Sequence, residues 1–204
     1  MENYVNLNTS RILMNDKLTK LQHIFKLKEI ERSGKVLERK ESTAEHTWSS
    51  MMLAEYFLKQ MSHDLDELKV LKLILYHDVV EIEAGDVHIV NQTPEKAEKE
   101  QQAFEKLKDL IPIELKDEYS EYFHEYENRT SKEAKFAKAI DALEPMIHWL
   151  NDKPAWKASG FTEENLKEFK EKHLVEFPEL MDFYKRLIEY LKQEDYIYEF
   201  LTSS

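Results

Sequence analysis

The feature that most constrains this chain is the ten-residue stretch from His77 to Asp86, which turns acidic directly after the apolar run VLKLILY. That run predicts a buried helix. On a helix of about 3.6 residues per turn, His77 and Asp78 lie about 100° apart and Glu81 projects between them. Buried carboxylates are unfavourable unless a cation compensates them. The stretch therefore predicts one wall of a metal site on a helix that ends at Gly85, with Asp86 in the closing turn.

The rest of the sequence favours helix as well. Only 3 of the 204 residues are Gly and 5 are Pro, which leaves little material for the turns of an all-β fold. Long runs of Glu, Lys, Leu and Ala are typical of helices. We therefore predict an all-α protein in which one helical bundle carries additional C-terminal helices.

Composition also limits the partners of the chain. There is no Cys, so a metal site must use His, Asp and Glu, and a reducing, cytoplasmic location is expected. A net charge of −12 opposes nonspecific binding to nucleic acid or to an anionic membrane. The polar N-terminal residues and the absence of a long apolar run predict neither a signal peptide nor a membrane anchor.

Hydrophobic periodicity predicts a series of helices separated by short polar breaks. Ser42 and Glu45 have the form of a capping box, which places His46 in the first turn of a helix. Residues 35–41 read as a charged connector before it. The predicted helices span residues 9–31, 42–61, 66–84, 94–110, 113–127, 132–150, 162–173 and 178–193.

The helix predicted over 132–150 carries an acid on a face of small side chains. Ala134, Ala137 and Asp141 share this face. Pro145 cannot donate a hydrogen bond to the carbonyl of Asp141, which loosens the helix at that residue. An acid on the small-residue face of a buried helix requires a partner, and a metal ion is one such partner.

Four residues emerge as candidate ligands: His46, His77, Asp78 and Asp141. Two imidazoles and two carboxylates suit one divalent metal ion, namely Mn, Co, Fe, Ni or Zn, and Mg is also compatible. Each residue is a weak signal when taken alone. A single His on a helix is more often an ordinary polar residue, and Asp141 has Lys138 or Arg129 as an alternative partner.

The order and spacing of these residues resemble the HD-domain metal-dependent phosphohydrolases. The likeness is greater to their 5′-deoxynucleotidase branch, which includes the HD-domain-containing protein 2 group. It covers about residues 12–150 and rests on the motifs TAEH at 43–46, HDxxExxxGD at 77–86 and YExxxSxEAKFxKxxD at 126–141. The resemblance implies an HD-domain helical bundle over 1–150, and the final third lies outside the resemblance. From the helical pattern we interpret 151–204 as a C-terminal helical extension packed on the same domain.

The resemblance also implies a role for each residue of the motifs. It implies hydrolysis of (deoxy)nucleoside 5′-monophosphates to nucleoside and phosphate by a metal-dependent phosphohydrolase of the 5′-nucleotidase type. The predicted metal ligands are His46, His77, Asp78 and Asp141, and the predicted catalytic acids, which act on the attacking water and the leaving group, are Glu81 and Asp86.

The chain departs from this branch at the substrate contacts. Members carry an Arg-Trp pair after the first helix that contacts phosphate and sugar, whereas this chain has Lys28-Glu29 and Arg32-Ser33. Lys28, Arg32 and His88 are the candidate substrate-binding residues, with a solvated loop as the alternative place for His88. The three tryptophans are expected in packing roles rather than as platforms for a base: Trp48, Trp149 and Trp156.

Two other functions compete with this reading. An HD-fold phosphohydrolase can act on another phosphate ester, such as a cyclic nucleotide or the alarmone guanosine tetraphosphate. Alarmone hydrolases place an acidic pair after the HD helix, whereas Ile82 follows Glu81 here. The non-enzymatic alternative is a metal-binding helical module, although such modules usually lose ligands and this chain keeps all six positions. The expected partners are a small-molecule nucleotide and a second copy in a homodimer, with no nucleic acid and no membrane.

Overall fold

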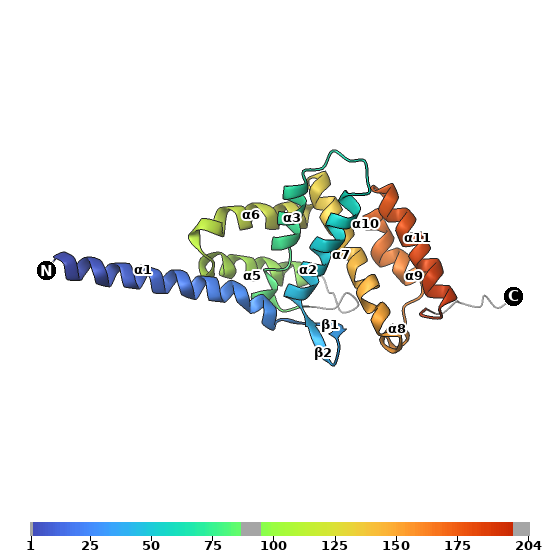
Figure 1. The fold of residues 1–204 in the computed structure, drawn as a ribbon, viewed down its shortest axis with the longest axis horizontal. Coiled ribbons are helices and arrows are strands. Elements are labelled where there is room, and N and C mark those ends of the chain that lie inside the picture. The colour runs from blue at the N-terminus through green and yellow to red at the C-terminus, as the bar shows by residue number, and fades with distance from the viewer. Residues whose placement is uncertain (1, 87–94, 198–204) are drawn as a thin grey trace.

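The computed structural model describes residues 2–86 and 95–197, and helices make up most of this part of the chain (Figure 1). The predicted all-α class is confirmed. At the centre are α2 (Thr43–Leu58), α3 (Glu67–Tyr76) and α7 (Lys132–His148), and α5 (Glu95–Leu110) and α6 (Ile113–Asn128) lie to one side of them. In the described ranges, no helix combines the length and hydropathy that a membrane crossing requires.

The N-terminal region differs from the sequence expectation. Helix α1 (Glu2–Ile24) is followed by a 3-10 turn, η1 (Phe25–Glu29), and then by the antiparallel hairpin of β1 (Glu31–Val36) and β2 (Arg39–Ser42). The prediction of helix to residue 31 and of a connector over 35–41 was therefore wrong. Periodicity missed the hairpin because its strands are short and mostly polar, and its turn depends on a positive φ of 55° at Leu37.

Local capping chemistry agrees with the sequence at two helix starts. The Ser42–Glu45 capping box opens α2, with the backbone N–H of Ser42 donating to Glu45 Oε2 at 2.9 Å. The hydroxyl of Ser131 accepts the backbone N–H of Ala134 at the start of α7. Because these bonds involve only neighbouring residues, sequence alone is enough to predict them.

The helix predicted over 66–84 is interrupted at the motif itself. Helix α3 ends at Tyr76, residues 77–80 form a turn, and α4 (Glu81–Ala84) follows. His77 donates from Nδ1 to the carbonyl oxygen of Ile74 at 2.6 Å, so a side chain satisfies one of the last carbonyls of α3. Gly85 ends α4 as expected, with a φ of 76°.

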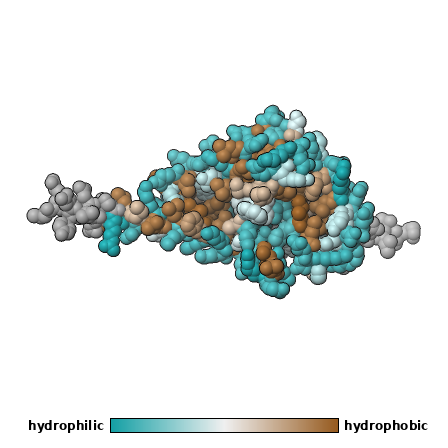
Figure 2. Space-filling model, viewed as in Figure 1, coloured by the Kyte–Doolittle hydropathy of each residue, from teal (hydrophilic) through white to brown (hydrophobic). Residues whose placement is uncertain are grey.

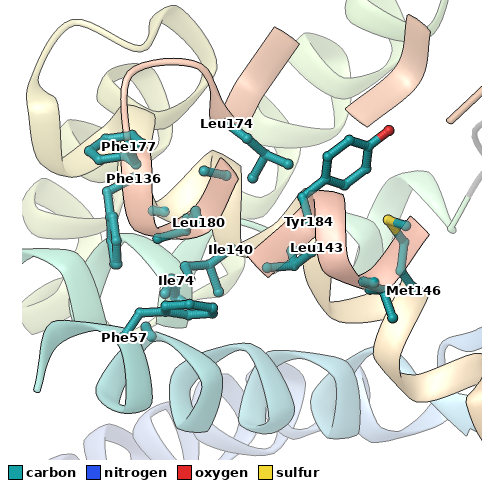
Figure 3. Close-up of a cluster of buried hydrophobic side chains, with 14 of the residues drawn as sticks. Phe57, Ile74, Phe136, Ile140, Leu143, Met146, Leu174, Phe177, Leu180 and Tyr184 are labelled. Atoms are coloured by element: carbon teal, nitrogen blue, oxygen red, sulfur yellow. The ribbon is translucent and has the colours of Figure 1, made fainter. Parts of the chain in front are cut away.

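The C-terminal third contributes to the same core as α2, α3 and α7 (Figure 3). Leu174, Leu180 and Tyr184 are buried there together with Phe57 and Ile140. The elements of this third are η3 (Trp149–Asn151), α8 (Lys153–Ser159), α9 (Glu163–Leu166), the π-helical turn η4 (Lys167–Glu171), α10 (Lys172–Leu174) and α11 (Pro178–Gln193). The expected loop over 151–160 was wrong, since the side chain of Asp152 caps α8 at Ala155.

From Arg11 onward, where its side chains are described, helix α1 has most of its apolar side chains outside this core. It extends away from the rest of the molecule, and apolar surface is visible along its coloured part (Figures 1 and 2). Leu13 and Leu18, which recur at helical spacing, are 59% and 49% exposed, whereas Leu27 in η1 is buried. Helical spacing predicted the apolar stripe but not whether another part of the chain covers it.

Candidate metal centre and active site

The four predicted ligands come from three segments and meet in the interior. His46 lies in the first turn of α2, His77 and Asp78 lie in the turn between α3 and α4, and Asp141 lies on α7. The Nε2 atoms of His46 and His77 are 3.1 Å and 3.8 Å from Asp141 Oδ1, and 3.8 Å and 3.0 Å from Asp78 Oδ2. The structure thus brings two imidazole nitrogens and two carboxylate oxygens to one point.

Neighbouring groups aim these four side chains. Glu144 Oε2 lies 2.7 Å from His46 Nδ1, and the carbonyl of Ile74 accepts from the corresponding atom of His77. Both imidazoles therefore turn Nε2 toward the common centre. Asp141 is oriented in the same way, because its Oδ2 accepts bonds of 2.8 Å each from the Tyr126 hydroxyl and the Lys138 ammonium. Such outer hydrogen bonds are typical of metal ligands.

The electrostatics of this centre fit a divalent cation. Burial opposes protonation of both imidazoles, but bonds with Asp141 and Glu144 raise the pKa of His46 to about 9, and the negative charges of Asp78 and Asp141 raise the pKa of His77 to about 10. The carboxylates thus attract positive charge strongly enough to hold protons on two buried rings. The Nε2 atom of His77 is buried without a hydrogen bond in this structure. One cation in place of these protons would satisfy the whole donor set.

Glu81 stands beside the four ligands and is equally enclosed. Its Oε2 accepts a bond of 2.8 Å from the hydroxyl of Thr43, and the residue is only 7% exposed. Burial raises the pKa of Glu81 to about 8, and the negative charge of Asp78 adds to the shift. A carboxylate with a raised pKa has the proton affinity expected of a general base.

The second predicted acid depends on a special backbone position. Asp86 directly follows Gly85, whose φ of 76° and ψ of 154° are accessible almost only to glycine. Arg32, on β1, places its Nη1 3.3 Å from Asp86 Oδ1 and 3.4 Å from Asp78 Oδ2. The guanidinium therefore links the acid that follows α4 to one of the candidate ligands.

The three predicted substrate contacts separate in the structure. Arg32 lines the cleft above the four ligands. Lys28 is exposed, holds its ammonium 4.9 Å from the centre of the Phe25 ring and is not among the residues that line the cleft. The expectation for His88 falls outside the described residues. Arg32 lies on a short strand and Lys28 in a 3-10 turn, so the two side chains differ in direction although they are only four residues apart. Helical spacing did not predict this difference.

The cleft that holds these groups has a polar end and an aromatic end. Its cavity volume is about 160 Å³. The polar end contains Asp78, Glu81 and Asp86, and the aromatic end contains Trp149 and Trp156. Trp149 and Trp156 were expected only to pack in the core, but they also line the cleft. Trp48 is 65% exposed and does not pack in the core.

Sequence reasoning missed several residues that shape the site. Tyr126 and Glu144 orient ligands, and Lys170 lines the cleft from the C-terminal third. An acid within the apolar run Leu143 to Met146 was a visible signal for Glu144. Nothing in the local sequence marks Lys170, because it lies in a helix with many exposed lysines.

A helical bundle that gathers His, His-Asp and Asp from separate helices is the architecture of the HD class. The sequence model of the HD domain family matches residues 24–181, and the chain therefore belongs to that family. The match extends beyond the limit of residue 150 that the motifs suggested, into the helices of the C-terminal third.

Named relatives refine this placement. The chain is 30% identical over 132 residues to mouse (Mus musculus) 5′-deoxynucleotidase HDDC2, a match that covers 62% of this chain and 65% of that protein. For the Xenopus laevis protein of the same name, identity is 30% over 142 residues, covering 67% of this chain and 69% of the relative. The match thus spans slightly less than two thirds of the mouse protein.

A solved structure extends the similarity over nearly the whole fold. The chain superposes with a TM-score of 0.80 on the crystal structure of a predicted metal-dependent phosphohydrolase from Magnetospirillum magnetotacticum. The two are 28% identical, and the alignment covers 91% of this chain and 96% of the other. The C-terminal third therefore lies largely within a fold shared with that protein.

Proposed function

We propose that this chain is a metal-dependent phosphomonoesterase that hydrolyses (deoxy)nucleoside 5′-monophosphates to nucleoside and phosphate. The observation that carries the proposal is the convergence of four ligand atoms beside Glu81, at the floor of a cleft with an aromatic end. Similarity to proteins named 5′-deoxynucleotidase supports the choice of reaction and substrate.

The proposed ligands are His46, His77, Asp78 and Asp141, whose donor atoms and outer hydrogen bonds fit one divalent transition metal. When bound, such an ion supplies Lewis acidity, which offsets charge on phosphoryl oxygens and makes water easier to deprotonate. The identity of the metal is part of the proposal. The candidates are Mn, Co, Fe, Ni, Zn and Mg, because imidazoles with carboxylates and no thiolate suit these ions.

The chain's own residues supply the proton transfer and the alignment. Glu81 accepts a proton from the attacking water as its oxygen bonds to phosphorus, a role that its buried position and raised pKa suit. Asp86 is ion-paired with Arg32, which suits a carboxylate that holds this water in line. The bond from phosphorus to the ribose oxygen then breaks, and Glu81 carries the proton that this oxygen must gain.

Charge favours a monophosphate as the substrate. One divalent ion together with Arg32 offsets a single dianionic phosphate. A longer phosphate chain would extend into a protein with a net charge of −12 that has no glycine-rich phosphate loop. The 5′ position is supported by the names of the relatives alone.

Phosphate release from dAMP, AMP, 3′-AMP, ADP and ATP tests this proposal, with Mn or Co added to metal-stripped protein. We expect the two 5′-monophosphates to be hydrolysed fastest. Faster turnover of ATP or 3′-AMP than of both 5′-monophosphates would refute the substrate assignment. Metal analysis tests the ligands separately: His77→Ala and Asp141→Ala should lose the ion, and full metal content in both variants would refute the ligand set.

Assembly, location and domain division belong to the same proposal. The exposed apolar side chains of α1 support a homodimer, which light scattering on the full chain tests. A cytoplasmic location accords with the absence of Cys, and cell fractionation tests it. We place the HD-type catalytic unit at 1–150 and the extension at 151–204. Limited proteolysis tests this division, and removal of the extension should unfold the shared core.

A further inference from the structure

The cleft above the metal ligands has a second wall, which the C-terminal third of the chain builds. The other lining residues include Arg32, Asp78 and Asp141, which come from elements before η3. The second wall comes from the segment from η3 to α10, which lies beside α7 (Figure 1). Its members are mostly aromatic, with one lysine among them: Trp149, Trp156, Phe161, Phe169, Lys170 and His173.

Lys170 is the unusual member of this wall. It lies in the π-helical turn η4 and is only 8% exposed, although it is a lysine. Within the described ranges its ammonium makes neither a hydrogen bond nor an ion pair. Single π-turns within helices occur frequently at functional sites. A buried lysine that lines a cleft without a partner lacks a structural explanation, since buried lysines are almost always paired.

Asp141, the nearby acid, does not act as the missing partner of the Lys170 ammonium. Burial lowers the pKa of Lys170 to about 8, and the attraction of Asp141 only partly opposes this shift. Asp141 already accepts bonds from Lys138 and Tyr126 and faces the two imidazoles. A divalent ion held by Asp141 would offset its remaining charge, which would leave Lys170 still less compensated.

We propose that Lys170 is a substrate-binding residue, whose ammonium contacts the phosphate of the monoester while the aromatic residues around it receive the rest of the substrate. This assignment rests on the proposed function, because it places the substrate in the same cleft. It gives the C-terminal third a role in recognition. Lys170 also supplies a cation from this wall in a chain that lacks the Arg-Trp pair after its first helix.

A phosphate monoester is the ligand that this geometry favours. Arg32 contributes positive charge from the opposite wall, but its guanidinium is engaged by Asp78 and Asp86. Lys170 is free to bond an incoming oxygen anion, and a dianion offers the charge that a buried ammonium lacks. The neighbouring rings suit a flat, apolar group rather than a second phosphate.

The test compares Lys170→Met with Lys172→Met, a matched control at an exposed lysine two residues away. Binding of inorganic phosphate to Mn-loaded full-length protein is measured by calorimetry, and kinetics with dAMP are measured in parallel. We expect the Lys170 variant to bind phosphate about 10- to 100-fold more weakly, the range expected for one lost charge-assisted hydrogen bond. KM should rise more than kcat falls, and the control should match the wild type.

Thermal melts provide a second measurement, in which the Lys170 variant is expected to equal or exceed the wild type although its phosphate affinity is lower. Without phosphate, Lys170→Met should melt at or above the temperature of the wild type, because the change removes a buried, unpaired charge. Phosphate should stabilise the wild type but not the variant. A purely structural Lys170 would give the reverse pattern, with a lower melting temperature and unchanged phosphate affinity, and that result would overturn the assignment.

The outcomes separate this inference from the proposed function. If no 5′-monophosphate is hydrolysed, the proposed function fails, and phosphate binding by the two variants still decides the role of Lys170. If the wild type binds no phosphate, or if Lys170→Met binds it with wild-type affinity, the inference fails while hydrolysis can stand. Lys170→Gln repeats the comparison should the Met variant not fold, and Lys170→Arg should restore part of the affinity.

Discussion

Glu144 is expected to control metal affinity without touching the metal. Its Oε2 lies 2.7 Å from His46 Nδ1, and both side chains are almost fully buried. With Glu144 ionised, the imidazole donates from Nδ1 and presents the lone pair of Nε2 to the centre. Glu144→Ala removes the only hydrogen-bond acceptor at Nδ1 that is observed in the described residues. The ring is then free to change its tautomer and its orientation.

The size of the effect follows from this geometry. Loss of an outer carboxylate partner typically weakens metal binding about 10- to 100-fold, which corresponds to about 1.4–2.8 kcal/mol. We expect Glu144→Ala to lie near the upper end, because the bond is short, buried and charge-assisted. Glu144→Gln keeps an acceptor oxygen for Nδ1 and should lose less than about tenfold.

Competition titration between metal-stripped protein and a fluorescent chelator measures this affinity for Mn and Co. Glu176→Ala is the matched control, since Glu176 is an exposed acid that pairs with Lys135. The reasoning is refuted if Glu144→Ala binds metal as tightly as the control variant. It is also refuted if Glu144→Gln is as weak as Glu144→Ala, because orientation of the ring would then not be the cause.

Three further predictions concern the same site. Glu81→Ala should keep its metal yet lose about 10²–10⁴-fold in turnover, as expected for a positioned base; metal analysis with kinetics checks this, and near-normal activity would exclude the role. The metal-free chain should lose stability as pH rises from about 6.5 toward 10, because His46 and His77, with folded pKa values of about 9 and 10, hold protons that the unfolded chain releases near 6.5. Urea unfolding across this range measures the trend, and constant stability would contradict it. Gly85→Ala should cost about 1–3 kcal/mol, because its φ and ψ are strained for any other residue, and should reduce turnover by displacing Asp86; unchanged melting and kinetics would show that the turn tolerates the change.

Features that depend on near neighbours were predictable from the sequence. The capping box at Ser42 and the cap at Ser131 involve residues three positions apart, so their chemistry is visible in the sequence. The set of ligand types was also restricted, because a chain without Cys must build a metal site from imidazoles and carboxylates. The positions of His46, His77, Asp78 and Asp141 followed from their order and spacing in the HD pattern.

The break in the helix at His77 and the position of Arg32 could not be predicted from the sequence, because both depend on competition between local and distant contacts. A continuous helix over 66–84 agreed with periodicity, but a bond from His77 to the carbonyl of Ile74 accompanies a break within it. Lys28 and Arg32 looked equivalent as cations, yet the hairpin carries only Arg32 into the cleft. Hydrophobic spacing predicts each helix separately. It does not predict where a strand or a turn forms instead of a helix.

The sequence by itself determined a helical protein, the residues able to bind a metal and the acids beside them, because these depend on propensity, capping and side-chain chemistry. The tertiary structure alone decided that Glu144 and Tyr126 orient the ligands and that Lys170 lines the same cleft as Asp78 and Asp141. Glu144 lies 98 residues from His46 in sequence, and Lys170 belongs to a third of the chain in which no motif was visible. Such contacts arise when separate helices bury their apolar faces in one core, and no local pattern records them.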